Sequence, residues 1–218
     1  MPSAAPVRID IVSDVICPWC FIGKRHLEAA LASRPDLSVT VRWHAFQLNP
    51  DMPREGMSRA DYLMAKFGDP NGGGIYDRVT AAGRQAGIAF AFDRITRTPN
   101  TLDAHRLIAL AADEDRQDAM VEALFQGYFL QGRDLSDREV LSAVAREAGL
   151  SDEAVERFRT TDVYEVEVLA EDGIARQSGI SGVPCFIFQR RFAVSGAHPP
   201  EVLARAMEQA QAEPVAVE

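Results

Sequence analysis

Cysteine, histidine and long apolar runs are all scarce in this chain of 218 residues. Its three cysteines are too few for the dense disulfide framework of a small secreted domain. No stretch reaches the roughly 20 apolar residues that a membrane-spanning helix needs. The net charge is −9 and no basic run offsets it, which argues against binding to nucleic acid or to an anionic membrane. We therefore expect a globular protein with neither nucleic acid nor membrane as a partner.

The first residues also lack the basic start and the uninterrupted apolar core of a signal peptide. We expect a cytoplasmic protein, in which a disulfide is transient and catalytic rather than structural. A zinc site needs two ligands besides one Cys-x-x-Cys pair. The sequence has neither a second such pair nor two histidines at ligand spacing, so no metal is expected.

Two of the three cysteines, Cys17 and Cys20, enclose Pro18 and Trp19 between an apolar run and a helical pattern. The leading N–H groups of a helix are unpaired and its macrodipole is positive there, which favours a thiolate at Cys17. Cys20, one turn further in, suits the resolving thiol that releases a mixed disulfide. Pro18 fits the first turn, where its missing N–H costs nothing. Trp19 adds apolar surface beside the sulfurs and no charge. The segment predicts a redox-active dithiol.

Periodicity predicts a β-α-β start, with strands over 7–12 and 37–46 around a helix over 18–32. A long helical block follows, with a short extended piece around 90–92 and helices over 59–67, 75–86, 101–113, 116–130, 137–148 and 163–178. Four helix starts read as capping pairs: Ser58 with Asp61, Asn100 with Asp103, Ser136 with Glu139, and Asp162 with Glu165. Strands over 185–189 and 191–195, a helix over 200–211 and a polar tail complete the chain.

Without the central block the order is β-α-β followed by α-β-β-α, which resembles the thioredoxin fold. We predict an α/β chain with a thioredoxin-like domain over 1–55 and 160–218 and an inserted helical domain over 56–159. Pro184 opens the third strand, a position where proline is tolerated. In the thioredoxin fold this bond is cis and packs against the dithiol, so we predict a cis Val183–Pro184 bond. The backbone of Val183 would then be free to pair with an extended substrate peptide.

Five segments carry a more specific resemblance: 13–20 around the dithiol, 46–53, 100–107, 181–184 and 195–197. On these segments the chain resembles the DsbA family of thioredoxin-like oxidoreductases with a helical insertion, and most closely its FrnE-like branch. The resemblance implies thiol–disulfide exchange with Cys17 attacking, Cys20 resolving and Pro184 as the cis proline. It also implies that the segment from Asn100 to His105 lies on an inserted helix that faces the dithiol.

Four further residues are candidates for the site. Asp14 is the acid nearest the dithiol; it either handles a proton, as a buried carboxylate does in thioredoxins, or caps the loop. His105 either forms a polar wall that binds substrate or moves a proton, or is a satisfied buried histidine. Asn100 belongs to the same segment. Cys185 either fills space in a central strand or captures one of the motif thiols. Of the other histidines, we expect His44 to be structural and His26 and His198 to be solvated.

Three functions stay open. The first is an oxidoreductase or isomerase acting on protein, peptide or glutathione disulfides, with glutathione or a thioredoxin-type protein as reductant and no tightly bound cofactor. The second is a glutathione-dependent isomerase or transferase, as in the related 2-hydroxychromene-2-carboxylate isomerases and kappa-class glutathione transferases. The third is a chaperone or interaction module with a vestigial dithiol. The second needs only one thiol, so the presence of Cys20 favours the first.

Overall fold

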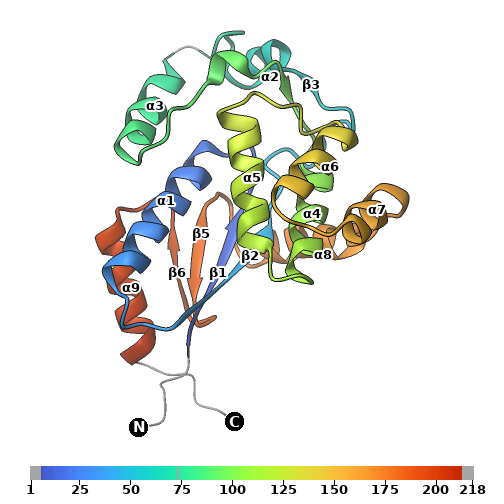
Figure 1. Cartoon of the computed structure of the whole chain (residues 1–218). Coiled ribbons are helices and arrows are strands. Elements are labelled where there is room, and N and C mark those ends of the chain that lie inside the picture. The colour runs from blue at the N-terminus through green and yellow to red at the C-terminus, as the bar shows by residue number, and fades with distance from the viewer. Residues whose placement is uncertain (1–5, 73, 213–218) are drawn as a thin grey trace.

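A computed structural model describes residues 6–72 and 74–212. Residues 1–5 and most of the predicted polar tail lie outside the described residues. At the centre is a four-stranded mixed sheet with the strand order β2-β1-β5-β6 (Figure 1). Its first two strands run parallel and the other pairings are antiparallel. The strands are β1 (Val7–Ser13), β2 (Val39–Ala45), β5 (Cys185–Phe188) and β6 (Phe192–Ser195), close to the predicted ranges.

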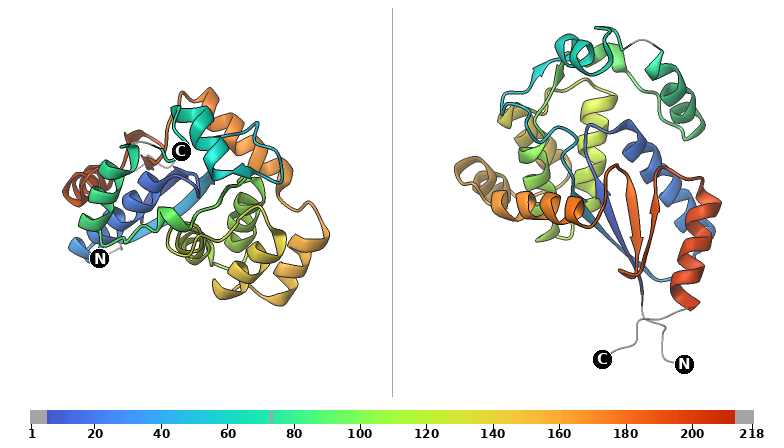
Figure 2. Two further views of the ribbon diagram at one scale, coloured as in Figure 1. Left: turned by 90° about the horizontal axis from the view of Figure 1, so that it is seen from above. Right: turned by 180° about the vertical axis from the view of Figure 1, so that it is seen from behind.

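Alternation along the strands sends their side chains to two different apolar clusters. Ile11 and Phe186 face the larger cluster, in which α1 (Pro18–Ser33) and α9 (Pro200–Ala212) cover one face of the sheet. Val12 and Cys185 face a smaller cluster with Ala175 of α8 (Glu165–Gln177), on the other face. Figure 2 shows this arrangement from above and from behind. The two faces separate Cys185 from the dithiol.

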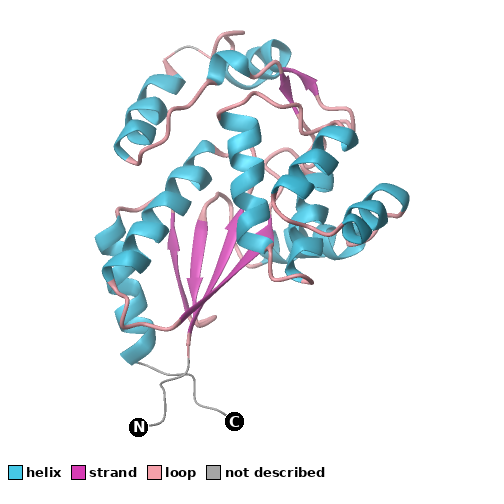
Figure 3. Cartoon of the chain, viewed as in Figure 1, coloured by secondary structure: helices cyan, strands magenta, loops and turns pink. Residues whose placement is uncertain are grey.

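The central block is helical, as predicted (Figure 3). Its helices are α2 (Arg59–Phe67), α3 (Ile75–Gln85), α4 (Leu102–Ala112), α5 (Gln117–Phe129), α6 (Arg138–Glu147) and α7 (Asp152–Thr160). The prediction missed α7, although its start carries an ordinary signal: the Ser151 hydroxyl accepts from the N–H of Ala154. It also missed a two-stranded sheet of β3 (Met57–Ser58) and β4 (Arg97–Thr98). The extended piece expected around 90–92 runs into the 3-10 helix η1 (Phe92–Arg94) instead.

Of the four predicted N-terminal capping pairs, one is present in the structure. The Ser58 hydroxyl accepts from the N–H of Asp61. In α6 the capping side chain belongs to Asp137, one residue after the predicted Ser136, whose own hydroxyl donates to Asp134. The N-cap positions of α4 and α8 are Thr101 and Tyr164, and neither side chain makes a capping hydrogen bond. Asn100 and Asp162 are therefore not the N-cap residues that the sequence predicts.

Apolar and ionic contacts hold α1 against α5. Phe21 of α1 stacks on Phe125 with ring centroids 5.0 Å apart. The buried ammonium of Lys24 pairs with Asp118 and Glu122 of α5, each at 3.1 Å, and with Glu28. Burial alone would lower the pKa of Lys24, but these carboxylates raise it above its usual value. A charge without solvent needs such partners, so these contacts fix the orientation of α1.

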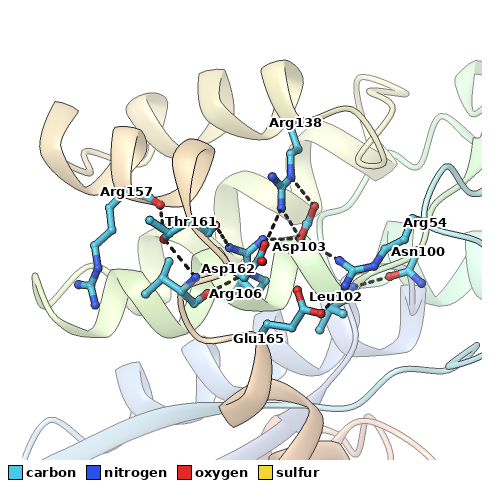
Figure 4. Close-up of polar contacts among 11 residues, drawn as sticks. Arg54, Asn100, Leu102, Asp103, Arg106, Arg138, Arg157, Thr161, Asp162 and Glu165 are labelled. Atoms are coloured by element: carbon cyan, nitrogen blue, oxygen red, sulfur yellow. Dashed lines mark hydrogen bonds and ion pairs between the residues drawn. The ribbon is translucent and has the colours of Figure 1, made fainter.

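A second ionic network fixes the start of α4 (Figure 4). The fully buried guanidinium of Arg106 donates to the Asp103 carboxylate at 2.7 Å. It also donates to the carbonyl oxygens of Thr161 and Val163 at 2.6 and 2.8 Å. Burial alone would raise the pKa of Asp103, but hydrogen bonds from Arg138 and Arg106 hold it below its usual value. Because Arg106 bonds to residues beyond 159, the proposed domain boundary there is bridged by side-chain contacts.

The architecture is the predicted one: an α/β thioredoxin fold with a large helical insertion. Within the described ranges, no helix is long and apolar enough to cross a membrane.

Candidate active site

The dithiol lies at the start of α1. Cys17 is the N-cap residue, with extended backbone angles, and Pro18 occupies the first helical position, as predicted. The Cys17 N–H donates to the Asp14 carbonyl at 3.1 Å, and the Cys20 N–H donates to the Cys17 carbonyl at 3.0 Å. Both cysteines are free thiols, 5% and 1% exposed. The turn thus brings two thiols together at the edge of the core.

The environment of Cys20 favours its neutral form. Burial raises the pKa of the Cys20 thiol well above its usual value, and its hydrogen bond with Cys17 adds to the rise. Hydrogen bonds with the Ser13 side chain and the Asp14 backbone act in the opposite direction and are outweighed. Cys20 is therefore held as a thiol at neutral pH, and a base must take its proton before it can attack a disulfide.

The loop before β5 lies directly against the dithiol. The Val183–Pro184 peptide bond is cis, as the sequence predicts. The Cys17 thiol donates to the Val183 carbonyl oxygen at 3.5 Å. In this state the oxygen is therefore occupied, whereas the sequence analysis expected it to be free to pair with a substrate peptide. Pro184 is buried, and a Cβ atom at Gly23 would lie 2.9 Å from its Cγ. The glycine in α1 is what allows the helix to approach this loop so closely.

The outer rim of the site is aromatic and cationic. Trp19 is half-buried, and the Arg78 guanidinium of α3 lies 5.8 Å from the centre of its ring. Arg78 was not among the residues predicted for the site, because 59 positions separate it from Trp19 and only the packing of α3 brings the two together. Phe21 is fully buried and takes no part in this rim.

Asp14 and His105 meet behind the dithiol. Both side chains are buried, at 0% and 3% exposure. One Asp14 carboxylate oxygen, Oδ2, accepts from the Leu48 N–H at 2.7 Å. The other, Oδ1, lies 3.4 Å from His105 Nε2, and among the described residues neither of these two atoms has a hydrogen-bond partner. The structure thus brings His105 of α4 to the loop that carries the dithiol.

Asn100 and Cys185 lie elsewhere. The Asn100 side chain donates to the Met52 carbonyl at 2.6 Å and accepts from the Leu102 N–H at 2.9 Å, so both ends of its amide anchor the start of α4. Cys185 packs in the apolar cluster on the opposite face of the sheet, and burial raises the pKa of its thiol. This position favours the space-filling interpretation of Cys185.

The remaining histidines lie apart from the dithiol. His44 bonds Asp10 through Nε2 at 2.9 Å and Glu171 through Nδ1 at 3.0 Å, which suits the structural role expected of it. His26 Nδ1 contacts the carbonyl of His198 at 2.8 Å. Among the described residues, no group of three or more His, Cys, Asp and Glu side chains is arranged to hold a metal ion.

Comparison with known proteins agrees with this geometry. A probable DsbA oxidoreductase from Streptomyces coelicolor shares 34% sequence identity, with a TM-score of 0.84, over 97% of this chain and 93% of that one. A cytosolic disulfide reductase, DsbM from Pseudomonas aeruginosa, solved with GSH, has a TM-score of 0.65 at 19% identity over 94% and 96% of the two chains. A 2-hydroxychromene-2-carboxylate isomerase has a TM-score of 0.69 at 17% identity over 93% and 95%.

The last two likenesses show the fold alone. The family described as "DSBA-like thioredoxin domain" matches residues 8–208, which include the dithiol, the cis proline and the helical insertion. The chain belongs to the DsbA-like thioredoxin family.

Proposed function

We propose that the protein is a thiol–disulfide oxidoreductase, of the FrnE-like type, that acts through Cys17 and Cys20 on protein, peptide or glutathione disulfides. The observation that carries this proposal is the pairing of the two thiols at the start of α1, with Cys17 against the Val183 carbonyl and Cys20 buried behind it. A cysteine that only fills space in the core does not require contact with a second thiol, whereas disulfide exchange does.

The proposed reaction has two exchanges. The Cys17 thiolate attacks one sulfur of a substrate disulfide, a bond forms between the two sulfurs, and the other substrate sulfur leaves as a thiolate. The Cys20 thiolate then attacks Cys17 and releases the second substrate thiol, which leaves a Cys17–Cys20 disulfide. Glutathione or a thioredoxin-type reductant returns the protein to the dithiol. Cys17 is the attacking thiol because it occupies the N-cap position of α1, at the positive end of the helix macrodipole, which favours a thiolate.

Substrate contact is proposed on the rim around Cys17. Trp19, which lies within the motif, and Val183, whose carbonyl contacts Cys17, are both half-buried and offer apolar surface. The Val183 carbonyl, which now accepts from Cys17, becomes free for an extended peptide once Cys17 is a thiolate or a disulfide. We propose a reducing or isomerising direction in the cytoplasm, where the glutathione pool is reducing.

Turnover in an insulin-reduction assay tests the proposal, with glutathione and its reductase as electron source. We expect loss of turnover in both Cys17→Ser and Cys20→Ser. Turnover should be retained in Cys185→Ala, the matched control at a buried cysteine on the other face of the sheet. Turnover that survives Cys17→Ser would refute it.

A glutathione-dependent isomerase is the second candidate, because the fold is shared with a 2-hydroxychromene-2-carboxylate isomerase and with a DsbM solved with GSH. Such an enzyme activates glutathione with one residue and does not use a resolving thiol. Full activity of Cys20→Ser would favour this candidate over disulfide exchange.

A further inference from the structure

Arg59, the first residue of α2, is a half-buried cation without a carboxylate partner among the described residues. Eight other arginine and lysine side chains in the described ranges are buried or half-buried, and each forms an ion pair with a carboxylate at 3.4 Å or less: Arg8, Lys24, Arg25, Arg34, Arg97, Arg106, Arg133 and Arg138. Arg59 alone departs from this pattern in that part of the chain. A charge that is drawn out of water needs a compensating partner, so its isolation calls for an explanation.

Neutral groups hold the Arg59 side chain in place. Its Nη1 donates to the Thr98 hydroxyl at 3.2 Å and to the Tyr128 hydroxyl at 3.4 Å, and its Nη2 donates to the Tyr76 hydroxyl. Burial raises the pKa of Tyr76 and of Tyr128, so neither becomes a phenolate that could neutralise the guanidinium at neutral pH. Of the five N–H groups of the guanidinium, the one on Nε donates to no described residue. The charge is therefore oriented but not balanced, and one donor is spare.

Arg59 lines a cavity of ≈ 440 Å³ in the helical insertion. The cavity lies between α2, the start of α3 and the segment from η1 to β4, and α2 and α3 lie together at the top of Figure 1. Its volume falls within the range of small-molecule sites, roughly 300–1,000 Å³. Much of its wall is apolar or aromatic and is formed by Leu63, Tyr76, Phe92 and Ile95. No lining residue in the described ranges comes from α1 or the dithiol loop, so the cavity is separate from the proposed active site.

Two features of the cavity favour an organic anion. The N-terminus of α2 lines it through Ser58, Arg59 and Ala60, so the helix macrodipole adds positive potential to the charge of the guanidinium. The apolar and aromatic walls favour a ligand that covers them with an apolar body of its own. A ligand with one negative charge and a flat apolar body satisfies both.

We propose that this cavity binds a small organic carboxylate with an aromatic body, and that Arg59 is its anion receptor. The carboxylate accepts from the spare Nε–H of Arg59, and the aromatic body packs against the rings of Tyr76 and Phe92. Binding is non-covalent and requires neither motif cysteine, so the site is independent of the proposed disulfide exchange.

Asp93 of η1 limits the charge of the ligand. It is the one acid among the described lining residues, is exposed, and forms no ion pair with a described residue. Its negative charge opposes an anion in the same cavity, so a monoanionic carboxylate is favoured over a phosphate dianion. Removal of this charge should therefore strengthen carboxylate binding.

Isothermal titration calorimetry on the full chain tests the site, with 2-naphthoate as the probe and 2-naphthamide as its neutral analogue. The two compounds share an aromatic body and differ in charge, so their difference in affinity reports recognition of the carboxylate. Arg59→Gln removes the cation and Asp93→Asn removes the opposing charge. Arg94→Gln, at an exposed arginine of η1 outside the cavity lining, is the matched control for the change in net charge. Urea denaturation of each variant shows whether it folds as the parent does.

For the parent we expect a dissociation constant for 2-naphthoate below about 1 mM, and binding of 2-naphthamide that is weaker by about 10-fold or more. Arg59→Gln should weaken 2-naphthoate binding by about 10-fold or more and leave 2-naphthamide binding unchanged. Asp93→Asn should strengthen 2-naphthoate binding by about 2- to 5-fold, and Arg94→Gln should match the parent.

The proposal is overturned if the parent does not bind 2-naphthoate or binds the two probes equally, or if a folded Arg59→Gln keeps the parent's affinity for the carboxylate. If Arg59→Gln does not fold, the comparison of the two probes on the parent and the Asp93→Asn variant still decides. An affinity of Asp93→Asn for 2-naphthoate that is no higher than the parent's would contradict a carboxylate in this cavity.

Discussion

Replacing Gly23 with alanine tests how closely α1 is packed against the loop of the cis proline. In the structure, a Cβ at this position would lie 2.9 Å from Pro184 Cγ and 3.1 Å from the Phe186 ring. Both atoms belong to buried residues, so neither can move away into solvent. Gly173 of α8 is the matched control, because it also lies inside a helix but a Cβ there would meet nothing within 4 Å.

The magnitude follows from two opposing effects. Alanine is a better helix former than glycine by about 1 kcal/mol in a helix interior, which applies to both sites. Overpacking of a buried contact costs about 1–3 kcal/mol and applies to Gly23 alone. Gly173→Ala should therefore raise the free energy of unfolding by about 1 kcal/mol. Gly23→Ala should leave it unchanged or lower it by up to about 2 kcal/mol.

Urea denaturation followed by circular dichroism measures this difference. With an m value of about 2 kcal/mol/M, the midpoints of the two variants should differ by about 0.5–1.5 M, with Gly23→Ala the lower. Equal midpoints, or a more stable Gly23→Ala, would refute the inference that this glycine is required by the approach of α1 to Pro184. A control measurement of m in each variant shows whether the comparison is valid.

Three further predictions concern buried groups. Arg106→Met should lower the free energy of unfolding by about 2–4 kcal/mol, because it leaves the carbonyl oxygens of Thr161 and Val163 without their donor and removes one of the guanidinium partners of Asp103. Arg146→Met, which removes an exposed pair, should change it by less than about 1 kcal/mol, and equal urea midpoints would contradict the contrast. Cys185→Ala should leave the redox midpoint in glutathione buffer unchanged, and a shifted midpoint would contradict its placement on the opposite face. The third prediction concerns His44. Burial alone would lower the pKa of His44, but hydrogen bonds with Glu171 and Asp10 raise it above its usual value. The stabilisation is complete below the unfolded pKa of about 6.5 and is lost as the pH rises through the higher folded pKa. The advantage of the wild type over His44→Gln in urea midpoint should therefore shrink as the pH rises above about 6.5.

Much of the fold was accessible from the sequence because its signals are local. The strand Val7–Ser13, the helix that begins at Pro18 and the helix Arg59–Phe67 follow from apolar periodicity, a proline at the first helical position and a serine cap. The same signal was present at Ser151, where the prediction overlooked the start of α7. The caps of α4 and α8 failed for a different reason. Their starts are fixed by tertiary contacts such as those of Arg106 and Asn100 with distant carbonyl groups, which no local pattern contains.

The candidate site likewise contains residues that local signals predict and residues that only tertiary packing brings together. Cys17 and Cys20 are recognisable from their spacing alone, and the cis bond before Pro184 follows from its place in the fold. The contact of His105 with Asp14 joins residues 91 positions apart, and Arg78 over Trp19 joins residues 59 apart. Such pairs depend on how the helical insertion packs against the sheet. Phe21, which follows the motif directly, is fully buried, because α5 covers that face of α1 with aromatic rings.

Mapping of the covalent intermediate by mass spectrometry tests the central claim most directly. Reduced Cys20→Ser protein is treated with oxidised glutathione, digested, and searched for the modified cysteine. We expect a stable glutathione adduct on Cys17 in this variant, and a Cys17–Cys20 disulfide with Cys185 unmodified in the wild type. An adduct on Cys185, or an unreactive Cys17, would contradict it.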